Sequence, residues 1–346
     1  MPVKALQYTA IGMPPEIREV STPQPGPGEV LLKMTAAGVC HSDEYFMSLH
    51  AEEYTFGLPL TLGHEGAGIV AGLGAGARGV KEGDPVALYG AWGCGNCRTC
   101  ATGAENYCPN AAALKIPWPG FDAPGCMAEY MLVPNPRHLV PLGDLDPVRN
   151  VPLTDAGITP YHAIKPSLPK LVPGSTAVVI GVGGLGHLAI QILRALSPAQ
   201  VIALDISDDK LAFARDIGAH ASFLSDRASI DAVRELTRGR GADAVFNFVG
   251  VQETADLAAK LVGRDSDIVM VGLGPGVVPV GLDTLPGGTS VRAPVWGTRS
   301  DLFEVLDLAR SGAIKVEIEM FSLEDGPKAF ERLHARTLLG RAVLIP

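Results

Sequence analysis

The 346-residue sequence has few charged residues, no long apolar run and no cluster of basic side chains. Charged residues make up 19% of the chain against 47% hydrophobic ones, which excludes a disordered chain. The 28 basic and 37 acidic residues give a formal net charge of −9, and without a basic patch we expect no nucleic-acid partner. No run approaches the roughly 18 apolar residues of a membrane span, so we expect no membrane association.

Cysteine is also scarce, with six residues, and four of them lie between positions 94 and 108. The first residues, Met1-Pro2-Val3-Lys4, lead to a polar Gln7 and lack the apolar region of a signal peptide. We therefore expect a cytoplasmic protein. Crowded cysteines in such a chain indicate metal ligands rather than disulfides.

The length predicts about two domains. Residues 1–150 contain short β-like runs separated by proline and glycine, which is typical of an irregular, mostly antiparallel β domain with long functional loops. The expected strands there are Val3–Tyr8, Glu29–Ala36, Gly68–Val70 and Pro85–Leu88.

From residue 176 onward, apolar strands alternate with helical patterns, which predicts a parallel sheet covered on both faces. The expected strands are 176–180, Val201–Asp205, Ala221–Leu224, Ala242–Val249 and Asp267–Gly272. The expected helices between them are 185–196, Asp208–Ile217, Ser229–Thr237 and Glu253–Leu261. The last segment, about 293–346, predicts helices Asp301–Arg310 and Leu323–His334 and a strand Arg341–Ile345. The pattern does not decide whether this segment extends the parallel sheet or returns to the first domain.

A glycine-rich turn connects the first of these strands to its helix, with Gly181-x-Gly183-x-x-Gly186 as its core. Strand, glycine turn and helix N-terminus form the arrangement that binds a pyrophosphate. We expect Gly181 to form the tight turn, Gly183 to admit the pyrophosphate and Gly186 to pack helix on strand. The intervening members of the predicted cofactor-binding loop are Val182, Gly184 and Leu185.

Asp205 ends the next strand, 24 residues after Gly181. An acidic residue in this position accepts the ribose 2′-hydroxyl of a dinucleotide and repels a 2′-phosphate, which predicts NAD rather than NADP. The alternative is that Asp205 only caps the following helix.

The cysteine-rich loop reads Cys94-x2-Cys97-x2-Cys100-x7-Cys108 and spans 15 residues. Four thiolates bind zinc tetrahedrally and leave no position for substrate, so we predict a structural zinc site. An iron–sulfur cluster is the alternative, although its usual last spacer is three residues rather than seven.

Cys40 follows one expected strand, and His64 lies just before another, so the two residues are on separate loops. A cysteine and a histidine are two of the three protein ligands that an open catalytic zinc site requires. Cys126 has no neighbouring ligand-type residues, so we expect it only to pack in the core.

The segment Leu62–Gly68, the four-cysteine loop and the glycine turn occur in the order and at the spacing of the zinc-dependent medium-chain alcohol dehydrogenases. The sequence resembles this family over essentially its whole length and is most similar to bacterial NAD-dependent secondary alcohol dehydrogenases. The resemblance implies an α/β fold with two domains. A GroES-like, mostly-β catalytic domain would hold both zinc sites (residues 1–156 and 293–346). A Rossmann domain with a doubly wound parallel sheet would bind NAD (157–292).

Residue by residue, the resemblance implies Cys40, His64 and Asp155 as ligands of the catalytic zinc. Many relatives carry a cysteine where this chain has Asp155, and secondary alcohol enzymes commonly show the aspartate. Glu65 resembles a carboxylate that approaches the metal during ligand exchange. The alternative is that Asp155 caps a helix starting near 156 and Glu65 is the third ligand.

The resemblance also implies that Ser42 accepts the alcohol proton. Many relatives continue this proton relay with a histidine five residues after the zinc cysteine, where this chain has Tyr45, and His50 is a second candidate for that role. His41 and Arg341 resemble pyrophosphate contacts. Four further residues resemble contacts to the nicotinamide end of the cofactor: Thr159, Val249, Leu273 and Gly297.

The function that the resemblance implies is interconversion of secondary alcohols and ketones by hydride transfer to and from NAD(H). Two zinc ions per subunit and a homotetramer belong to the same expectation. Primary alcohols, aldehydes or polyols are the alternative substrates, and a dehydrogenase fold retained as a binding protein is the alternative outside enzymes. Bulky candidates to line the substrate pocket are Tyr45, Tyr54, Trp118 and Trp296, together with residues 115–125.

Overall fold

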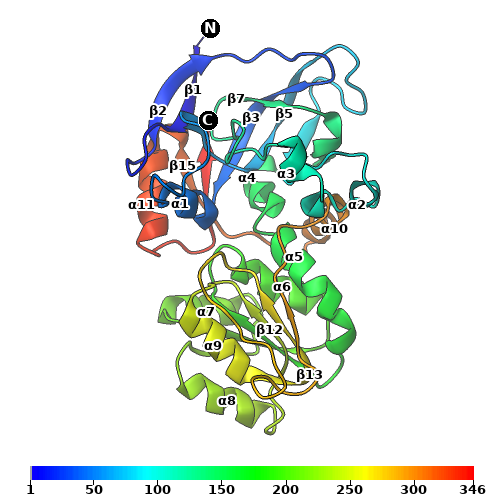
Figure 1. Ribbon diagram of the computed structural model, residues 1–346, viewed down its shortest axis with the longest axis vertical. Helices are drawn as coiled ribbons and strands as arrows, with labels where there is room; N and C mark the ends of the chain where they lie inside the picture. The colour runs from blue at the N-terminus through cyan, green and yellow to red at the C-terminus, as the bar shows by residue number, and fades with distance from the viewer. Residues whose placement is uncertain (1) are drawn as a thin grey trace. The chain divides into compact units, whose positions relative to one another are not determined.

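Two separate units, each with its own sheet and hydrophobic core, make up the computed structural model, which describes residues 2–346 (Figure 1). Unit 1 runs from the first described residue to Asp155 and includes Thr298–Arg310 and Val316–Pro346; unit 2 comprises Ala156–Gly297 and Ser311–Lys315. These limits differ by a few residues from the ranges 1–156, 157–292 and 293–346 expected for the two domains.

Unit 1 is built on a seven-stranded sheet in the order β15-β16-β3-β5-β6-β8, with β7 also paired to β3. A smaller sheet has the order β2-β1-β4. The strands are β1 Pro2–Tyr8, β2 Glu16–Ser21, β3 Val30–Val39, β4 Leu60–Thr61, β5 Glu65–Leu73, β6 Pro85–Leu88, β7 Tyr130–Val133, β8 Leu139–Pro141, β15 Ile318–Ser322 and β16 Arg341–Ile345. All four strands expected in this half are present, and β5 is longer than the predicted 68–70.

Strand β3 is the centre of this unit because it pairs with β5, β7 and β16. Its side chains are buried on both faces except at Lys33 and Thr35, so its sequence is nearly continuously apolar rather than alternating. Around the sheet lie the helices and 3₁₀ turns α1 His41–Met47, α2 Arg98–Ala101, η1 Glu105–Tyr107, α3 Ala111–Leu114, η2 Pro136–His138, α4 Pro147–Asn150, η3 Val151–Thr154, α10 Arg299–Arg310, η5 Leu323–Asp325 and α11 Gly326–His334.

The C-terminal strand β16 answers the question that the sequence pattern leaves open. It pairs antiparallel with β3, with Ala342 opposite Val39 and Leu344 opposite Ala37. The segment therefore returns to unit 1, and Figure 1 shows the red α11 and β15 among blue N-terminal elements.

Unit 2 contains a six-stranded, wholly parallel sheet in the order β11-β10-β9-β12-β13-β14. Its strands are β9 Thr176–Ile180, β10 Gln200–Asp205, β11 Ala221–Leu224, β12 Ala242–Asn247, β13 Val262–Met270 and β14 Ser290–Arg292. Its helices are α5 Ile158–Ile164, η4 Lys165–Lys170, α6 Gly186–Leu196, α7 Asp208–Asp216, α8 Ala228–Leu236 and α9 Gln252–Leu261. The strand order reverses at β9, and ligands of such sheets bind at the carboxyl ends of the strands beside this reversal.

The expected βα alternation is confirmed, and the structure adds β14, which the sequence pattern did not indicate. Among residues 2–346, no helix is both long enough and apolar enough to cross a membrane.

Candidate active site and metal centre

Cys40, His64, Glu65 and Asp155 form a buried cluster at one end of the unit 1 sheet. Cys40 directly follows β3, Glu65 begins β5, and the two strands are antiparallel neighbours with Gly38 opposite Glu65. Asp155 follows the short η3 turn, which packs against both strands. One ligand atom from each of the four residues lies within 4.8 Å of the others. The pairing of β3 with β5 therefore brings together residues that are far apart in the sequence.

Asp155 Oδ2 lies closest to the other potential ligands. It is 3.3 Å from Cys40 Sγ and 3.7 Å from His64 Nε2. Asp155 does not cap the next helix, because that helix begins at Ile158 and its N-cap residue is Gly157. The alternative of a capping role is therefore wrong.

Asp43 holds the cluster in position and was not singled out from the sequence. Its Oδ2 accepts a hydrogen bond from the Cys40 backbone N–H at 3.0 Å, and its Oδ1 lies 3.1 Å from His64 Nδ1. The bond places the His64 proton on Nδ1 and directs Nε2 toward the cluster, an arrangement that metal-bound histidines share. The signal was present in the sequence, since Asp43 stands at the third position of the helix that Cys40 precedes, as in a capping box.

The electrostatics of the cluster reflect four ionisable groups buried together. Burial by itself would lower the pKa of His64, but the carboxylates of Asp43 and Asp155 raise it well above its ordinary value. Burial would raise the pKa of Asp155, yet its hydrogen bond with His64 and the nearby Arg341 charge lower it. Burial raises the pKa of Glu65, and Asp155 adds to this effect while Arg341 opposes it. Such a concentration of negative charge suits a divalent cation.

Arg341 brings a guanidinium cation to this cluster, where it contacts both Glu65 and Asp155. Its Nη2 lies 3.0 Å from Asp155 Oδ2. Its Nε donates to Glu65 Oε2, and its Nη2 donates to Glu65 Oε1. The side chain is only 2% exposed. The structure thus brings Arg341 to the metal-type cluster, while its expected contact with a pyrophosphate stays a prediction.

The four-cysteine loop forms a second cluster, in the same unit. Sγ–Sγ distances are 3.4 Å for Cys97–Cys100, 3.9 Å for Cys94–Cys100 and 4.0 Å for Cys97–Cys108. Four sulfurs about 2.3 Å from a tetrahedral zinc ion are about 3.8 Å apart, so these distances fit zinc. Backbone N–H groups of Asn96 and Cys97 lower the pKa of Cys94 to about 6, which favours the thiolate. None of the six cysteines forms a disulfide.

Glu105 supports the loop from inside. Its carboxylate accepts a hydrogen bond from the Gly93 backbone at 2.8 Å and pairs with Arg137 at 3.3 Å. Arg137 in turn donates to the Gly93 carbonyl. The turn before Cys94 is therefore held by a partly buried ion pair as well as by any metal.

In unit 2, the glycine turn has the backbone that a phosphate site requires. Gly181 has φ +91°, and a Cβ on Gly186 would lie 1.7 Å from the Gly181 carbonyl oxygen, so no side chain fits at either position. At Gly183, by contrast, no atom lies within 4 Å of a Cβ, so that side of the turn is open. The first turn of α6 begins at Gly186 without a side-chain cap. The His187 backbone N–H donates to the Gly183 carbonyl at 3.1 Å, and no side chain caps the helix, whose N-terminal end is the part of a helix that attracts an anion.

Asp205 faces this turn from the end of β10. Its Oδ2 accepts from the Val182 backbone N–H at 2.7 Å, and its Oδ1 accepts from Ile206 and Ser207. The residue that caps α7 is Ser207, so the alternative of Asp205 as helix cap is wrong. A carboxylate offers about four acceptor positions, and these three bonds leave one on Oδ2 for a further donor.

Comparison with known proteins identifies the family. The model of the alcohol dehydrogenase GroES-like domain matches residues 26–144, and that of the zinc-binding dehydrogenases matches 184–311. The chain belongs to the zinc-dependent medium-chain alcohol dehydrogenases. An NAD-dependent alcohol dehydrogenase of Sulfolobus acidocaldarius is 34% identical, covering 99% of each chain.

Two further relatives show how this family varies. The D-arabinose 1-dehydrogenase (NADP(+)) of Saccharolobus solfataricus is 36% identical over 99% of this chain and 97% of its own. The solved structure of acetophenone reductase from Geotrichum candidum, in complex with NAD, is 30% identical with a TM-score of 0.85 and covers 100% of this chain and 97% of its own. Unit 1 thus has the GroES-like fold of an alcohol dehydrogenase and unit 2 the Rossmann fold, and the protein is an oxidoreductase acting on alcohols.

The remaining predicted site residues of this dehydrogenase fall into two groups. Val249 lies against the glycine turn, since its Cγ2 is 2.7 Å from the Cβ position of Gly181, and Gly272, which precedes Leu273, packs on the Val249 backbone. Gly297 packs on Ile158, next to Thr159, in the same unit. In unit 1, His41 begins α1 and is exposed, as are Tyr45 and His50. The structure does not bring Tyr45 or His50 to the metal cluster through any described contact.

A row of aromatic side chains in mutual contact begins at the ring of His64. Phe121 stacks on the His64 ring with centroids 4.9 Å apart, and Phe46 contacts Phe121 at the same distance. Phe56 and Tyr54 continue the row. Tyr54 and the 115–125 segment were predicted, whereas Phe46 and Phe56 were not, because an isolated phenylalanine carries no signal of position.

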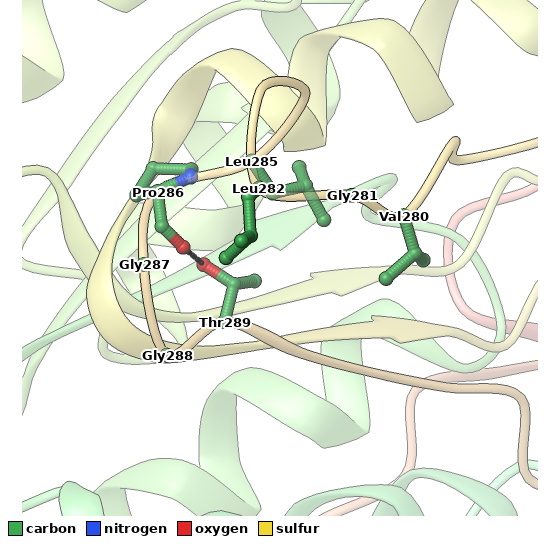
Figure 2. Close-up of a pocket in the computed structure, with 8 residues that line it drawn as sticks. All are labelled: Val280, Gly281, Leu282, Leu285, Pro286, Gly287, Gly288 and Thr289. Atoms are coloured by element: carbon green, nitrogen blue, oxygen red, sulfur yellow. Dashed lines mark hydrogen bonds between the residues drawn. The ribbon is translucent and has the colours of Figure 1, made fainter.

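A shallow cavity of about 220 Å³ lies elsewhere, in unit 2. Figure 2 shows its lining, which consists of Val280, Gly281, Leu282, Leu285, Pro286, Gly287, Gly288 and Thr289. None of these residues is ionisable or ligates metals. The cavity is therefore no candidate for the redox site.

Proposed function

We propose that this protein interconverts secondary alcohols and ketones with NAD(H) and holds two zinc ions per subunit. The buried cluster of Cys40, His64 and Asp155 carries the proposal. One thiolate, one imidazole and one carboxylate match the softness that zinc prefers, and three ligands leave the fourth position open for substrate. The four-cysteine loop would hold the second, structural ion.

The geometry favours Asp155 over Glu65 as the third ligand. Asp155 Oδ2 lies 3.3 Å from Cys40 Sγ and 3.7 Å from His64 Nε2. Arg341 contacts only this one oxygen of Asp155, whereas it contacts both oxygens of Glu65. When bound, zinc would supply Lewis-acid chemistry that acidifies the alcohol hydroxyl. NAD, held at the glycine turn and Asp205, would supply the hydride acceptor.

Ser42 stands where a proton can leave the alcohol. Its Oγ lies 3.0 Å from Cys40 Sγ and 3.4 Å from His64 Nε2, and the residue is only partly buried. A hydroxyl donates and accepts, so Ser42 can take a proton at Oγ and release its own toward solvent. This role for Ser42 needs no second histidine beside it.

The aromatic row beside His64 supports secondary alcohols with an apolar substituent. Phe121, Phe46 and Phe56 offer no hydrogen-bonding group to the extra hydroxyls of a polyol, whose burial would cost free energy. The sugar-oxidising relative favours a polyol as the second candidate substrate. Turnover of 2-propanol, 1-phenylethanol, ethanol and sorbitol with NAD, with and without a chelator, tests the proposal. Preference for sorbitol, or turnover that no chelator diminishes, would refute it.

Asp205 should set the cofactor preference. We expect Asp205→Ser to reduce the ratio of kcat/KM for NAD to that for NADP by about 10- to 100-fold, because hydrogen bonds to charged groups contribute about 1.5–3 kcal/mol. Asp205→Asn is the comparison variant: it removes the charge and keeps one acceptor oxygen, while its Nδ2 cannot accept the backbone bonds made by the other oxygen. An unchanged ratio in both variants would exclude this role for Asp205.

We further propose that the protein is a cytoplasmic homo-oligomer, with a tetramer as the expected state. Strand β14 ends the unit 2 sheet and pairs only with β13 among the described residues. The neighbouring segment exposes Val280 at 69% and Leu282 at 94%. An exposed edge beside apolar side chains is a typical surface for a second copy.

Sedimentation of the purified protein tests the assembly, and cell fractionation tests the location. Leu282→Glu should shift the assembly toward smaller species, with Met320→Glu, another exposed apolar position, as control. A monomer in the unsubstituted protein would contradict the proposal.

A further inference from the structure

Arg341 is an unusual residue to find beside a metal site, because it is a cation buried against two carboxylates that also face the metal position. Its Nη2 lies 3.0 Å from Asp155 Oδ2, while Nε lies 3.2 Å from Glu65 Oε2 and Nη2 contacts Glu65 Oε1. Glu65 is completely buried. One guanidinium therefore engages both oxygens of Glu65 and a single oxygen of Asp155.

The backbone around the pair is shaped to hold Glu65 in this position. Gly38 lies opposite Glu65 in the β3–β5 pairing, and a Cβ on Gly38 would be 2.0 Å from Glu65 Oε2. Arg341 begins β16, which is fixed by its pairing with the same strand β3. Three adjacent strands thus position one carboxylate on one guanidinium.

The charges explain why such a pair is needed. A thiolate at Cys40 and carboxylates at Glu65 and Asp155 bring three negative charges to a dication, an excess of one. The buried carboxylate of Asp43, beside Cys40 and His64, adds to that excess, and the guanidinium of Arg341 reduces it. Without Arg341, Glu65 would be a buried carboxylate with no cation except the metal, and burying an uncompensated charge is costly.

We propose that Arg341 is a positioning residue that keeps Glu65 out of the metal's coordination shell and so preserves the open position for substrate. The inference rests on the proposed zinc-dependent function. Loss of Arg341 would let Glu65 become a fourth protein ligand, and a closed shell of four ligands has no position for substrate. Arg341 engages both oxygens of Glu65 but only one of Asp155, so it restrains Glu65 more than Asp155 and leaves Asp155 as the ligand.

Cobalt-substituted enzyme tests this proposal through its visible spectrum, with imidazole as the probe ligand. The four-thiolate site has no open position, so an imidazole-dependent change reports the other site alone. We expect Arg341→Gln to weaken imidazole binding by tenfold or more. The double variant Arg341→Gln/Glu65→Gln should restore binding to within about threefold of that measured for Glu65→Gln alone.

A merely structural role for Arg341 would not be rescued by removing Glu65, so equally weak binding in the single and double variants would overturn the proposal. Normal binding in Arg341→Gln would overturn it as well.

Where Arg341→Gln does not fold, Arg341→Lys is the second variant. It keeps the positive charge but loses the planar guanidinium that donates to both oxygens of Glu65. It should show weaker binding that Glu65→Gln rescues, and binding equal to that of the unsubstituted enzyme would refute the proposal. Absence of both alcohol turnover and an imidazole response in the unsubstituted enzyme would instead refute the proposed function, and this inference with it.

Discussion

Cys40→Ala is expected to abolish alcohol oxidation and to remove about one zinc ion per subunit while the fold survives. The Cys40 thiolate is one of the three proposed ligands in a four-residue cluster whose ligand atoms lie within 4.8 Å of one another, so its loss leaves two of the three proposed ligands, His64 and Asp155. Metal-ion catalysis contributes several kcal/mol of transition-state stabilisation, which corresponds to a fall in kcat/KM of about a thousandfold or more. Steady-state kinetics and metal analysis on the same preparation measure both effects.

The chain contains its own matched control for this substitution. Cys126 is also fully buried, and its Sγ lies 3.1 Å from the Glu65 carbonyl oxygen, yet it belongs to neither cluster. Cys126→Ala should keep both zinc ions and most of the activity. If Cys40→Ala retains both ions and normal turnover, the proposed catalytic site is wrong.

Asp155→Ala extends the same experiment to the third ligand. We expect it to lose the same zinc ion and the same activity as Cys40→Ala, because its Oδ2 faces Cys40 and His64. Retention of both ions in Asp155→Ala would show that Glu65 serves as the ligand instead.

Cys97→Ser is expected to have the second largest effect, on stability rather than on chemistry. Cys97 caps α2 and contributes one of four sulfurs, and its Sγ lies 3.4 Å from that of Cys100. Because binding free energy of a structural zinc ion is folding free energy, loss of one ligand should lower the Tm by about 5–10 °C. Scanning calorimetry and metal analysis, again with Cys126→Ala as control, provide the measurement.

The same preparation distinguishes zinc from the iron–sulfur alternative. The intact protein should be colourless with two zinc ions per subunit, and Cys97→Ser should keep the catalytic ion and a near-normal kcat at temperatures where it is folded. Visible absorbance or bound iron in the purified protein would contradict the structural zinc site. An unchanged zinc content in Cys97→Ser would do so as well.

The two sites that the sequence reveals most directly are local ones. The glycine turn and Asp205 belong to one βαβ unit, so their spacing along the chain already contains their geometry. The four cysteines lie on one short loop, which can close on a metal whatever the rest of the chain does. The geometry of both could therefore be predicted, while their roles as cofactor and metal sites stay predictions. The alternative of Asp205 as a helix cap is wrong because Ser207, two residues later, is the N-cap of α7.

The catalytic cluster is different because it is assembled from distant segments. Cys40 and Asp155 are separated by 115 residues and Asp155 and Arg341 by 186. No spacing rule connects such positions, so only the family resemblance pointed to Asp155. The phenylalanines around His64 carried no signal of their own, since a phenylalanine is equally consistent with many environments, and only its capping-box position after Cys40 marked Asp43.

The sequence by itself determined the strand and helix alternation of unit 2, the dinucleotide turn, the metal-binding loop and the family. Only the tertiary structure decided that the last strand returns to β3, that Cys40, His64, Glu65 and Asp155 lie together, and that Arg341 contacts Glu65. The physical reason is the range of the interactions. Turns, caps and closely spaced ligands are fixed by neighbours in the chain, whereas the partner of a buried charge is fixed by which strands pair.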